Sequence, residues 1–250
     1  MGRAFVMLDT ETTGAGPSDR LCQIAFLVAQ NGADLTLHQD LCKPPLPIGA
    51  GAMAVHHITP EMVENAPEYA ACESAAVLAD LNDGENILVI HNAPFDVGML
   101  QREGVAWKGA VIDTLRCARH LIESESHALQ YLRYQLGLYR EEPAIADRLG
   151  VAIAAHDAVG DVVVLYLLMQ HLLAQVGKSA AGIEQLITLS SQPVLIKRFR
   201  FGKHKGMAFE EVARSDPGYL DWLLKAEMQK SEPDEDLRYT LQHYLQGRAG

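Results

Sequence analysis

This chain of 250 residues has few of the features that mark secreted or membrane proteins. Its four cysteines (Cys22, Cys42, Cys72 and Cys117) are widely spread and have no paired metal-binding spacing, which favours reduced thiols. The longest apolar run, residues 162–169, is much shorter than the roughly 20 residues that span a bilayer. Because the N-terminus enters an apolar strand without a basic leader, we expect no secretion signal, no membrane contact and a cytoplasmic location.

The chain also lacks the excess of positive charge that is typical of nucleic-acid-binding proteins. Its 21 Lys and Arg stand against 32 Asp and Glu, which gives a net charge of −11, whereas phosphate binding usually needs a basic face. Two features weaken this objection. Acids that serve as metal ligands are offset by the cations they bind, and residues 197–205 (KRFRFGKHK) are locally basic. Net charge alone therefore does not decide the partner.

Hydrophobic residues make up 48% of the chain, enough for a large core, and their pattern predicts an α/β fold. Strands are expected at 4–9, 21–29, 34–42, 87–90 and 109–112, and helices at 60–65, 73–82, 94–103, 114–122, 127–136 and 157–176. Short polar turns join the first three strands, which predicts an antiparallel meander. A proline-rich segment at 44–47 is expected to open a loop that continues to residue 60.

A run of small residues at 177–182 (GKSAAG) predicts a boundary between two domains. We expect a first domain over residues 1–176, a linker over 177–182 and a smaller α+β unit over 183–250. The smaller unit is expected to contain one short hairpin and three helices. The sequence has no internal repeat and no low-complexity tract.

Asp9 and Glu11 lie one residue apart at the end of the first apolar strand. Residues i and i+2 of a strand face the same side, with Cα atoms roughly 6.6 Å apart at a rise of about 3.3 Å per residue. Two carboxylates so placed can share one divalent ion, or each can hold one of a pair. They are equally compatible with two acids at an exposed strand end.

Asp96 follows the apolar strand at 87–90 and lies in the first turn of a helix that starts near Pro94. Proline suits that position because its missing N–H has no partner there. The helix dipole also favours an acid in a first turn, so Asp96 alone does not indicate a metal site.

His156 and Asp161 lie at the start of the long apolar helix. If both were helical, their side chains would point ~140° apart. They can converge if His156 belongs to the preceding loop. Asp157 is the natural N-cap of this helix, and a histidine at a helix entry can equally be structural.

The ordered motifs Asp-x-Glu, His-Asn-x-x-Phe-Asp and His-x-x-x-x-Asp together resemble the DEDDh family of 3′–5′ exonucleases, over about residues 3–176. The resemblance implies a ribonuclease H-like fold, a mixed five-stranded sheet flanked by helices. It also implies two bound Mg²⁺ or Mn²⁺ ions and a histidine general base. The implied metal ligands are Asp9, Glu11, Asp96 and Asp161, and the implied base is His156. Gln23 stands where the family usually has glutamate, which leaves the metal set intact.

These residue types suit phosphodiester hydrolysis, which needs a water nucleophile, an in-line leaving oxygen and neutralisation of charge around phosphorus. Two hard divalent cations can supply all three, and they prefer oxygen ligands. A histidine with an ordinary pKa near 6.5 can take a proton from the attacking water at neutral pH.

The resemblance further implies which residues hold the 3′ end of the substrate. The turn after the first strand would contact the terminal sugar, and three histidine and asparagine side chains would line the nucleotide pocket. These residues are Thr10, Thr12, Thr13, His56, His91 and Asn92. Each is also compatible with an ordinary structural role in a turn or loop.

Residues 201–223 resemble the C-terminal module of the exonuclease X branch of the family. Lys203 and Lys205, flanked by glycines, could approach a DNA backbone closely, and Phe199 or Phe201 could stack on bases. The alternative is a small hairpin with a solvated basic tip and inward-packed phenylalanines.

The sequence thus predicts a metal-dependent 3′–5′ exodeoxyribonuclease that releases 5′-mononucleotides and serves DNA repair. One alternative is a 3′–5′ exoribonuclease with the same metal centre, because no identified residue excludes a 2′-hydroxyl. A second, from a different class, is a non-catalytic, polymerase-associated nucleic-acid-binding module. DNA 3′ ends, single- or double-stranded, are the expected partner. The resemblance leaves the oligomeric state open and allows a homodimer.

Overall fold

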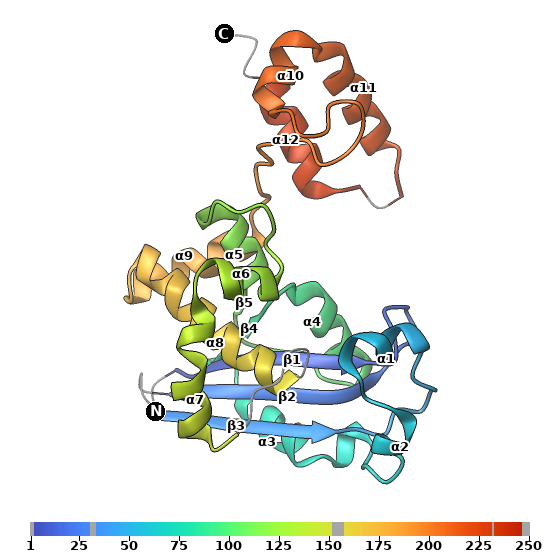
Figure 1. Cartoon of the computed structure of the whole chain (residues 1–250), viewed down its shortest axis with the longest axis vertical. Coiled ribbons are helices and arrows are strands. Elements are labelled where there is room, and N and C mark those ends of the chain that lie inside the picture. Colours follow the sequence, from blue (N-terminus) through green and yellow to red (C-terminus); the bar gives the residue numbers. More distant parts are fainter. Residues whose placement is uncertain (1–2, 31–33, 152–157, 232, 247–250) are drawn as a thin grey trace. The chain divides into compact units, whose positions relative to one another are not determined.

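The computed structural model describes residues 3–30, 34–151, 158–231 and 233–246. The chain forms two compact units, Met1–Ser190 and Ser191–Gly250, and each is described by itself (Figure 1).

A five-stranded mixed sheet forms the centre of the first unit, with strand order β3-β2-β1-β4-β5. The strands are β1 (Phe5–Thr12), β2 (Leu21–Gln30), β3 (Asp34–Leu41), β4 (Ile87–Ile90) and β5 (Val111–Asp113). β1, β2 and β3 pair antiparallel, whereas β1 with β4 and β4 with β5 pair parallel. This arrangement confirms the predicted meander and the predicted mixed sheet.

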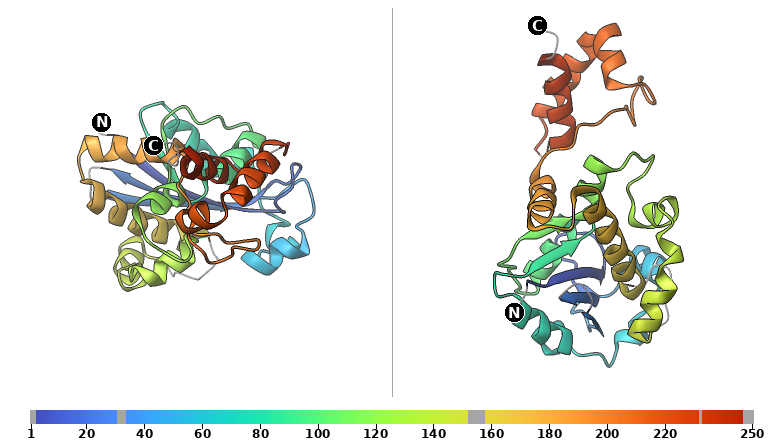
Figure 2. Two further views of the ribbon diagram at one scale, coloured as in Figure 1. Left: turned by 90° about the horizontal axis from the view of Figure 1, so that it is seen from above. Right: turned by 90° about the vertical axis from the view of Figure 1, so that its left-hand side faces the viewer.

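The alternating side chains of the strands pack into two cores, one on each face of the sheet. Met7 and Leu27 belong to the first core, and Leu8 and Phe26 to the second. Helices cover both faces (Figures 1 and 2). On the first face they are α5 (Thr114–Leu121), α6 (Leu129–Gln135), α7 (Glu142–Leu149), α8 (Ala158–Val176) and α9 (Ala180–Ser191), and on the second α3 (Glu73–Leu81) and α4 (Ala93–Arg102).

α8 is the central helix of the first core. It contacts β1 and β2, and its buried residues include Val162, Val163 and Leu168. By length and composition alone α8 could cross a membrane, since an 18-residue window has a mean hydropathy of 1.6. However, 61% of that window is buried inside this fold, so its place in the core accounts for its apolar composition.

Two helices within the described part of the first unit lie where the sequence predicts none, namely α1 (Ala50–His56) and α7, and α9 begins inside the predicted linker. α1 has only seven residues and no side-chain cap at Gly49, which leaves little local signal. The short elements α2 (Pro60–Val63), η1 (Tyr69–Ala71) and η2 (Leu138–Arg140) complete the unit.

The segment at 177–182 does not separate the two units as predicted. Gly177 ends α8 with a φ of 96°, and α9 starts three residues later, with Leu186 fully buried in the first core. A Cβ at Gly182 would lie 1.9 Å from the carbonyl oxygen of Gly177. The small residues therefore allow close packing between two helices rather than flexibility, and the chain divides after Ser190.

In the second unit, three helices surround a core formed by Phe199, Phe209 and Leu220 among others. They are α10 (Phe209–Ser215), α11 (Pro217–Met228) and α12 (Glu235–Gln246). The predicted hairpin is a loop closed by a single bridge between Arg198 and Ala208. Because Phe199 is only 1% exposed, it packs in this core and is not the stacking residue that the sequence allowed.

Candidate active site

The second half of β1 carries the two predicted carboxylates. Asp9 and Glu11 follow Met7 on the same face of the strand, and Met7 lies in the first core. Both acids are half-buried. α8 packs against β1 and carries Asp161 in its first turn. The β1 acids and the helix that carries Asp161 therefore share one face of the sheet.

Asp96 lies in the first turn of α4, as predicted, and is 4% exposed. α4 follows β4, the parallel neighbour of β1. Thr10 donates its hydroxyl to Asp96 Oδ1 at 2.6 Å. Burial raises the pKa of Asp96 to about 7, although the Thr10 hydrogen bond acts in the opposite direction. A nearby cation would favour the charged form of this carboxylate.

Asp113, at the end of β5, organises the turn that leads into α4. Its carboxylate accepts from the backbone N–H groups of Asn92 at 3.2 Å and Ala93 at 3.1 Å, and it also caps α5 by accepting from Leu115 N–H at 2.9 Å. Asn92 adopts a left-handed conformation with φ 74° and is exposed. Asp113 lies outside the three motifs of the family resemblance, and its role in the turn was not predicted.

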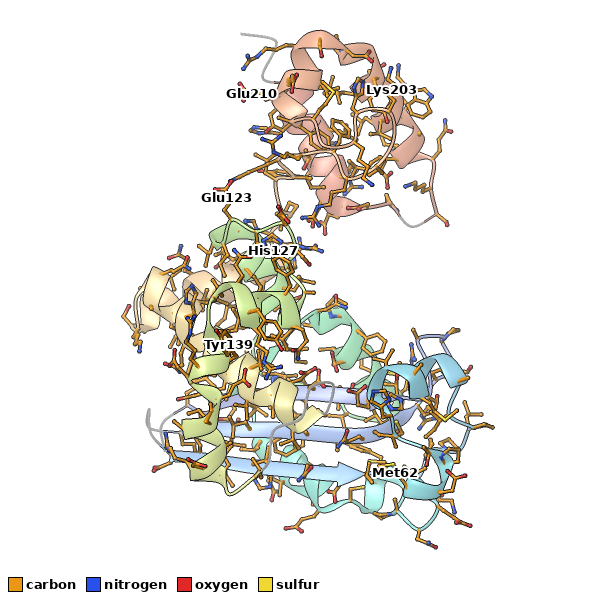
Figure 3. All side chains as sticks on the ribbon, in the orientation of Figure 1. Met62, Glu123, His127, Tyr139, Lys203 and Glu210 are labelled. Carbon is orange, nitrogen blue, oxygen red and sulfur yellow. The ribbon has the colours of Figure 1, made fainter. Side chains whose placement is uncertain are left out.

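His91, which directly follows β4, connects the end of this strand to α5 and to the segment before α6 through hydrogen bonds. Its Nε2 donates to the carbonyl oxygen of His127 at 2.8 Å (His127 is labelled in Figure 3), and its Nδ1 lies 2.9 Å from Thr114 Oγ1. Burial lowers the pKa of His91 to about 4, so the ring is neutral and Nδ1 accepts from the threonine hydroxyl. The sequence predicts that His91 lines the nucleotide pocket, but both of its ring nitrogens are hydrogen-bonded within the chain.

Asp161 is held by a relay of polar side chains from α6 and α7. Gln130 Nε2 donates to Asp161 Oδ1 at 2.5 Å, and Arg133 Nη1 donates to Gln130 Oε1 at 3.1 Å. Glu142, 4% exposed, fixes Arg133 through two bonds of 2.6 and 2.5 Å. The arginine cannot accept a hydrogen bond, so it sets the amide orientation of Gln130. Sequence reasoning missed all three residues, because none lies in a recognised motif.

The turn after β1 is fixed by internal hydrogen bonds. Thr12 donates to the carbonyl oxygen of Gly14 at 2.8 Å, and Thr13 donates to Asp19 Oδ1 at 2.6 Å. His56, 7% exposed, accepts from Ile58 N–H through Nδ1 at 2.9 Å, so its Nε2 donates to the carbonyl oxygen of Thr12 at 3.1 Å. Burial lowers the pKa of His56. His56 thus supports the turn that the sequence places at the substrate.

The predicted base, His156, and the predicted cap, Asp157, lie outside the described residues. Among the residues that are described, no three His, Cys, Asp or Glu side chains are close enough to hold one ion as they stand. The chemistry of the predicted ligands nevertheless fits hard divalent cations, because all four are carboxylates. The burial of Asp96 is also a cost that a bound cation would offset.

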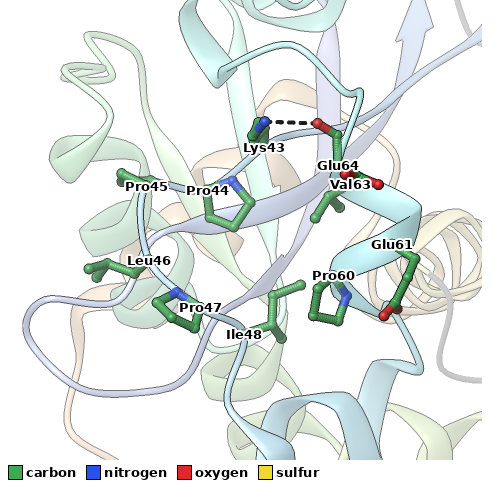
Figure 4. A pocket seen from close by; sticks show the side chains of 10 residues that line it. All are labelled: Lys43, Pro44, Pro45, Leu46, Pro47, Ile48, Pro60, Glu61, Val63 and Glu64. Atoms are coloured by element: carbon green, nitrogen blue, oxygen red, sulfur yellow. Dashed lines mark hydrogen bonds between the residues drawn. The ribbon is translucent and has the colours of Figure 1, made fainter.

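A hollow of about 510 Å³ lies between residues 43–48 and α2 (Figure 4). Its walls are mainly proline and aliphatic side chains, and Lys43 Nζ donates to the carbonyl oxygen of Glu64 at 2.8 Å. It contains none of the predicted site residues. The hollow is therefore separate from the candidate active site.

Comparison with known proteins decides the family. A family model described as exonuclease matches residues 6–169. The chain belongs to the exonuclease family. A second model, described as exodeoxyribonuclease X-like C-terminal, matches residues 199–227 of this exonuclease. The two matches confirm the family that the motifs predict for each unit.

Individual relatives agree with these matches. Exodeoxyribonuclease 10 of Escherichia coli is 30% identical over 240 residues, covering 96% of this exonuclease and 98% of that protein. A DNA polymerase III subunit epsilon-like protein of Rhodobacter capsulatus is 36% identical over 163 residues, covering 62% of this chain and 23% of that protein.

Solved structures confirm the predicted fold. Exonuclease X in complex with 5′ overhanging duplex DNA gives a TM-score of 0.56 at 24% identity, covering 75% of this chain and 99% of that chain. Escherichia coli exonuclease I in a complex with single-stranded DNA gives a TM-score of 0.54 at 21% identity, covering 75% of this chain and 43% of that chain.

Proposed function

We propose that this exonuclease hydrolyses DNA from the 3′ end and releases 5′-mononucleotides with the help of two divalent ions, Mg²⁺ or Mn²⁺. The observation that carries the proposal is the arrangement of four carboxylates around β1: Asp9 and Glu11 on β1 itself, Asp161 on α8, which contacts β1, and Asp96 on α4, which is bonded to Thr10 of β1. The match to exodeoxyribonuclease 10 along nearly the whole of both chains supports DNA as the polymer.

In this mechanism the four carboxylates would hold the ions, which when bound would neutralise charge around the scissile phosphate and lower the pKa of water. The residues around them keep each carboxylate in place. Thr10 orients Asp96 through its hydroxyl, and Gln130 orients Asp161 through its amide. His156 takes the proton from the attacking water.

The predicted substrate-binding residues divide into those that are hydrogen-bonded within the chain and one that is exposed. Thr12, Thr13, His56 and His91 form internal hydrogen bonds, so in this proposal they fix the shape of the nucleotide pocket. Asn92 is exposed at the turn before Asp96 and contacts the terminal nucleotide. Asn92→Ala should therefore raise KM for a short oligonucleotide more than it lowers kcat.

Digestion of end-labelled polymers tests this function. The full chain is incubated with 3′- or 5′-labelled single- and double-stranded DNA and with matched RNA, in Mg²⁺ and in chelator. We expect labelled mononucleotides from 3′-labelled DNA at the earliest times, and none in chelator. Efficient digestion of RNA beside inert DNA would instead favour an exoribonuclease, and release from the 5′ end would contradict the proposed direction.

A further inference from the structure

The second unit exposes aromatic side chains beside a basic loop. Phe201 is 43% exposed and Trp222 60% exposed, while Tyr219 lies half-buried next to Trp222, with ring centroids 5.6 Å apart. Gly202, which follows Phe201, lies so close to Tyr219 that a Cβ there would be 2.6 Å from the tyrosine hydroxyl oxygen. We call Phe201, Tyr219 and Trp222 the aromatic surface.

Tyr219 and one edge of Phe201 contact the core residue Phe199, with ring centroids 5.9 and 6.1 Å away, but the core does not cover the exposed parts of Phe201 and Trp222. Phe199 and Phe209 stack in the core with centroids 3.7 Å apart. On α11, Leu220 and Leu223 are buried, while Trp222 points outward. An exposed tryptophan in ring contact with Tyr219, and an exposed phenylalanine beside the glycine that approaches the same tyrosine, are typical of a binding site.

The loop beside the aromatic surface is held in one shape. Lys203 Nζ (Lys203 is labelled in Figure 3) lies 2.6 Å from Asp216 Oδ2 and 4.9 Å from the centre of the Tyr219 ring. His204 Nε2 contacts the same carboxylate at 3.0 Å. Hydrogen bonds from Lys203, the larger effect, and from His204 lower the pKa of Asp216. Lys203 therefore fixes the loop against Tyr219, which differs from the direct phosphate contact that the sequence suggests.

The same loop supplies positive charge for a phosphate backbone. Residues 197–206 contain five Lys and Arg and no Asp or Glu, in a chain with a net charge of −11. Arg200 and Lys205 are exposed on either side of Phe201 and Lys203 in sequence. Aromatic faces beside basic side chains are what a single strand needs, because bases stack on the rings and the backbone follows the charges.

We infer that the aromatic surface is a binding site for single-stranded DNA, in which bases stack on Trp222 and Phe201 and phosphates contact Arg200 and Lys205. The site goes beyond the proposed function, because it is non-catalytic and depends neither on the metal ligands nor on the direction of hydrolysis. It differs from the sequence-based expectation in its stacking residues and in the role of Lys203.

Binding of a 5′-fluorescein-labelled oligothymidylate of about 20 nucleotides to the full chain, followed by anisotropy in chelator, tests the site. Gel analysis confirms that the oligonucleotide stays intact. Trp222→Ala and Phe201→Ala should each raise Kd roughly 5- to 150-fold, the range for loss of one stacked base. Trp222→Phe should retain most of the affinity. Tyr239→Ala is the matched control, because Tyr239 is a 40% exposed aromatic of the same unit on α12, and it should leave Kd unchanged.

Salt dependence tests the phosphate contacts. Arg200→Ala and Lys205→Ala should each flatten the plot of log Kd against log salt by roughly 0.7 between about 50 and 200 mM. Wild-type Kd in Trp222→Ala and Phe201→Ala, with or without a change in thermal stability, would overturn the inference. So would tighter binding of the matched RNA than of the DNA. Mononucleotide release from a trinucleotide, measured in parallel, tests the proposed function separately, because so short a substrate needs only the active site.

Discussion

The two units of this exonuclease differ in the sign of the charge they carry and in the way they use it. Residues 191–250 hold ten Lys and Arg and nine Asp and Glu, so 11 and 23 remain in residues 1–190. The net charge of −11 is thus −12 in the first unit and +1 in the second. In the first unit, the four predicted ligand acids lie buried or half-buried on β1 and in the first turns of α4 and α8. In the second unit, exposed lysine and arginine side chains lie in the loop before α10, and exposed aromatic rings lie in that loop and on α11.

This difference shows why the charge of the whole chain was a poor guide to its partner. Carboxylates placed to hold cations make a nuclease acidic without making it repel its substrate, since bound ions offset the local charge. Contact with a polymer can then depend on a small basic region that contributes little to the net charge. The comparison predicts that variants of the first unit change turnover, whereas variants of the aromatic surface change affinity for long strands.

The largest effect is expected from Asp9→Ala. Loss of a carboxylate that holds an ion should lower mononucleotide release at least ~10³-fold in Mg²⁺ or Mn²⁺, because metal stabilisation is worth several kcal/mol. Initial rates on 3′-labelled DNA measure it. Asp34→Ala, an exposed acid at the start of β3 in the same sheet, should keep wild-type activity. Equal loss in both variants would mean that charge, and not position, matters.

His156→Ala should have the next largest effect. Removing a general base lowers kcat by about 10²-fold, while binding of DNA and of Mn²⁺ should stay as in the wild type. His171→Ala, a half-buried histidine near the end of α8 that is bonded to Gln175, serves as the control and should keep wild-type kcat. Normal turnover in His156→Ala would remove this residue from the mechanism.

Gln130→Ala should have a smaller effect, because Gln130 is a positioning residue that acts through Asp161. Loss of such support typically costs 10- to 100-fold in metal affinity, so the Kd for Mn²⁺ in DNA-free protein should rise by about that factor. Gln135→Ala, on the same helix but bonded to the carbonyl oxygen of Glu123, should not change this Kd. If the two variants bind Mn²⁺ equally well, the relay does not hold Asp161 for the ions.

The smallest effect is on the stability of the first unit in mild acid. His91 must stay neutral in the fold, with a pKa lowered from 6.5 to about 4 by burial. Between these values the unfolded chain binds more protons at this histidine, so the contribution of His91 to stability falls as pH falls from 6.5 to 4, by at most about 3 kcal/mol, whereas Asp96 with its raised pKa contributes in the opposite direction. In a Trp222→Phe background, Trp107 is the sole tryptophan and its fluorescence reports on the first unit. His91→Gln should flatten this pH dependence, and an unchanged slope would contradict it.

Sequence reasoning found the elements that have strong local patterns. β1, β2, β4 and the long α8 contain apolar runs with clear stops, and β3 mixes polar and apolar residues between two turns, so the sheet could be predicted. Asp9 and Glu11 in β1, and Asp96 and Asp161 in the first turns of α4 and α8, also lie on the elements where the sequence places them. α1 and α7 could not be predicted, because helices of seven and eight residues are too short to show a clear periodicity. At Gly182 the same small residue that signals a flexible linker serves a close contact between helices.

The supporting residues of the site were beyond the sequence for a different reason. The contacts among Gln130, Arg133 and Glu142 form only when α6 and α7 fold beside α8. No residue spacing in the sequence predicts those contacts. His56 and His91 were recognisable as motif residues, but a motif does not show which way a ring points. Only the hydrogen bonds show that both rings face into the fold.

Titration of the DNA-free full chain with Mn²⁺ tests whether carboxylates from β1, α4 and α8 together hold the ions of catalysis. Electron paramagnetic resonance counts the free ion at each addition and so gives stoichiometry and affinity without relying on turnover. If the four carboxylates hold two ions, we expect two bound ions per wild-type chain, and one or none in Asp9→Ala and in Asp161→Ala. Unchanged stoichiometry and affinity in both variants would contradict it.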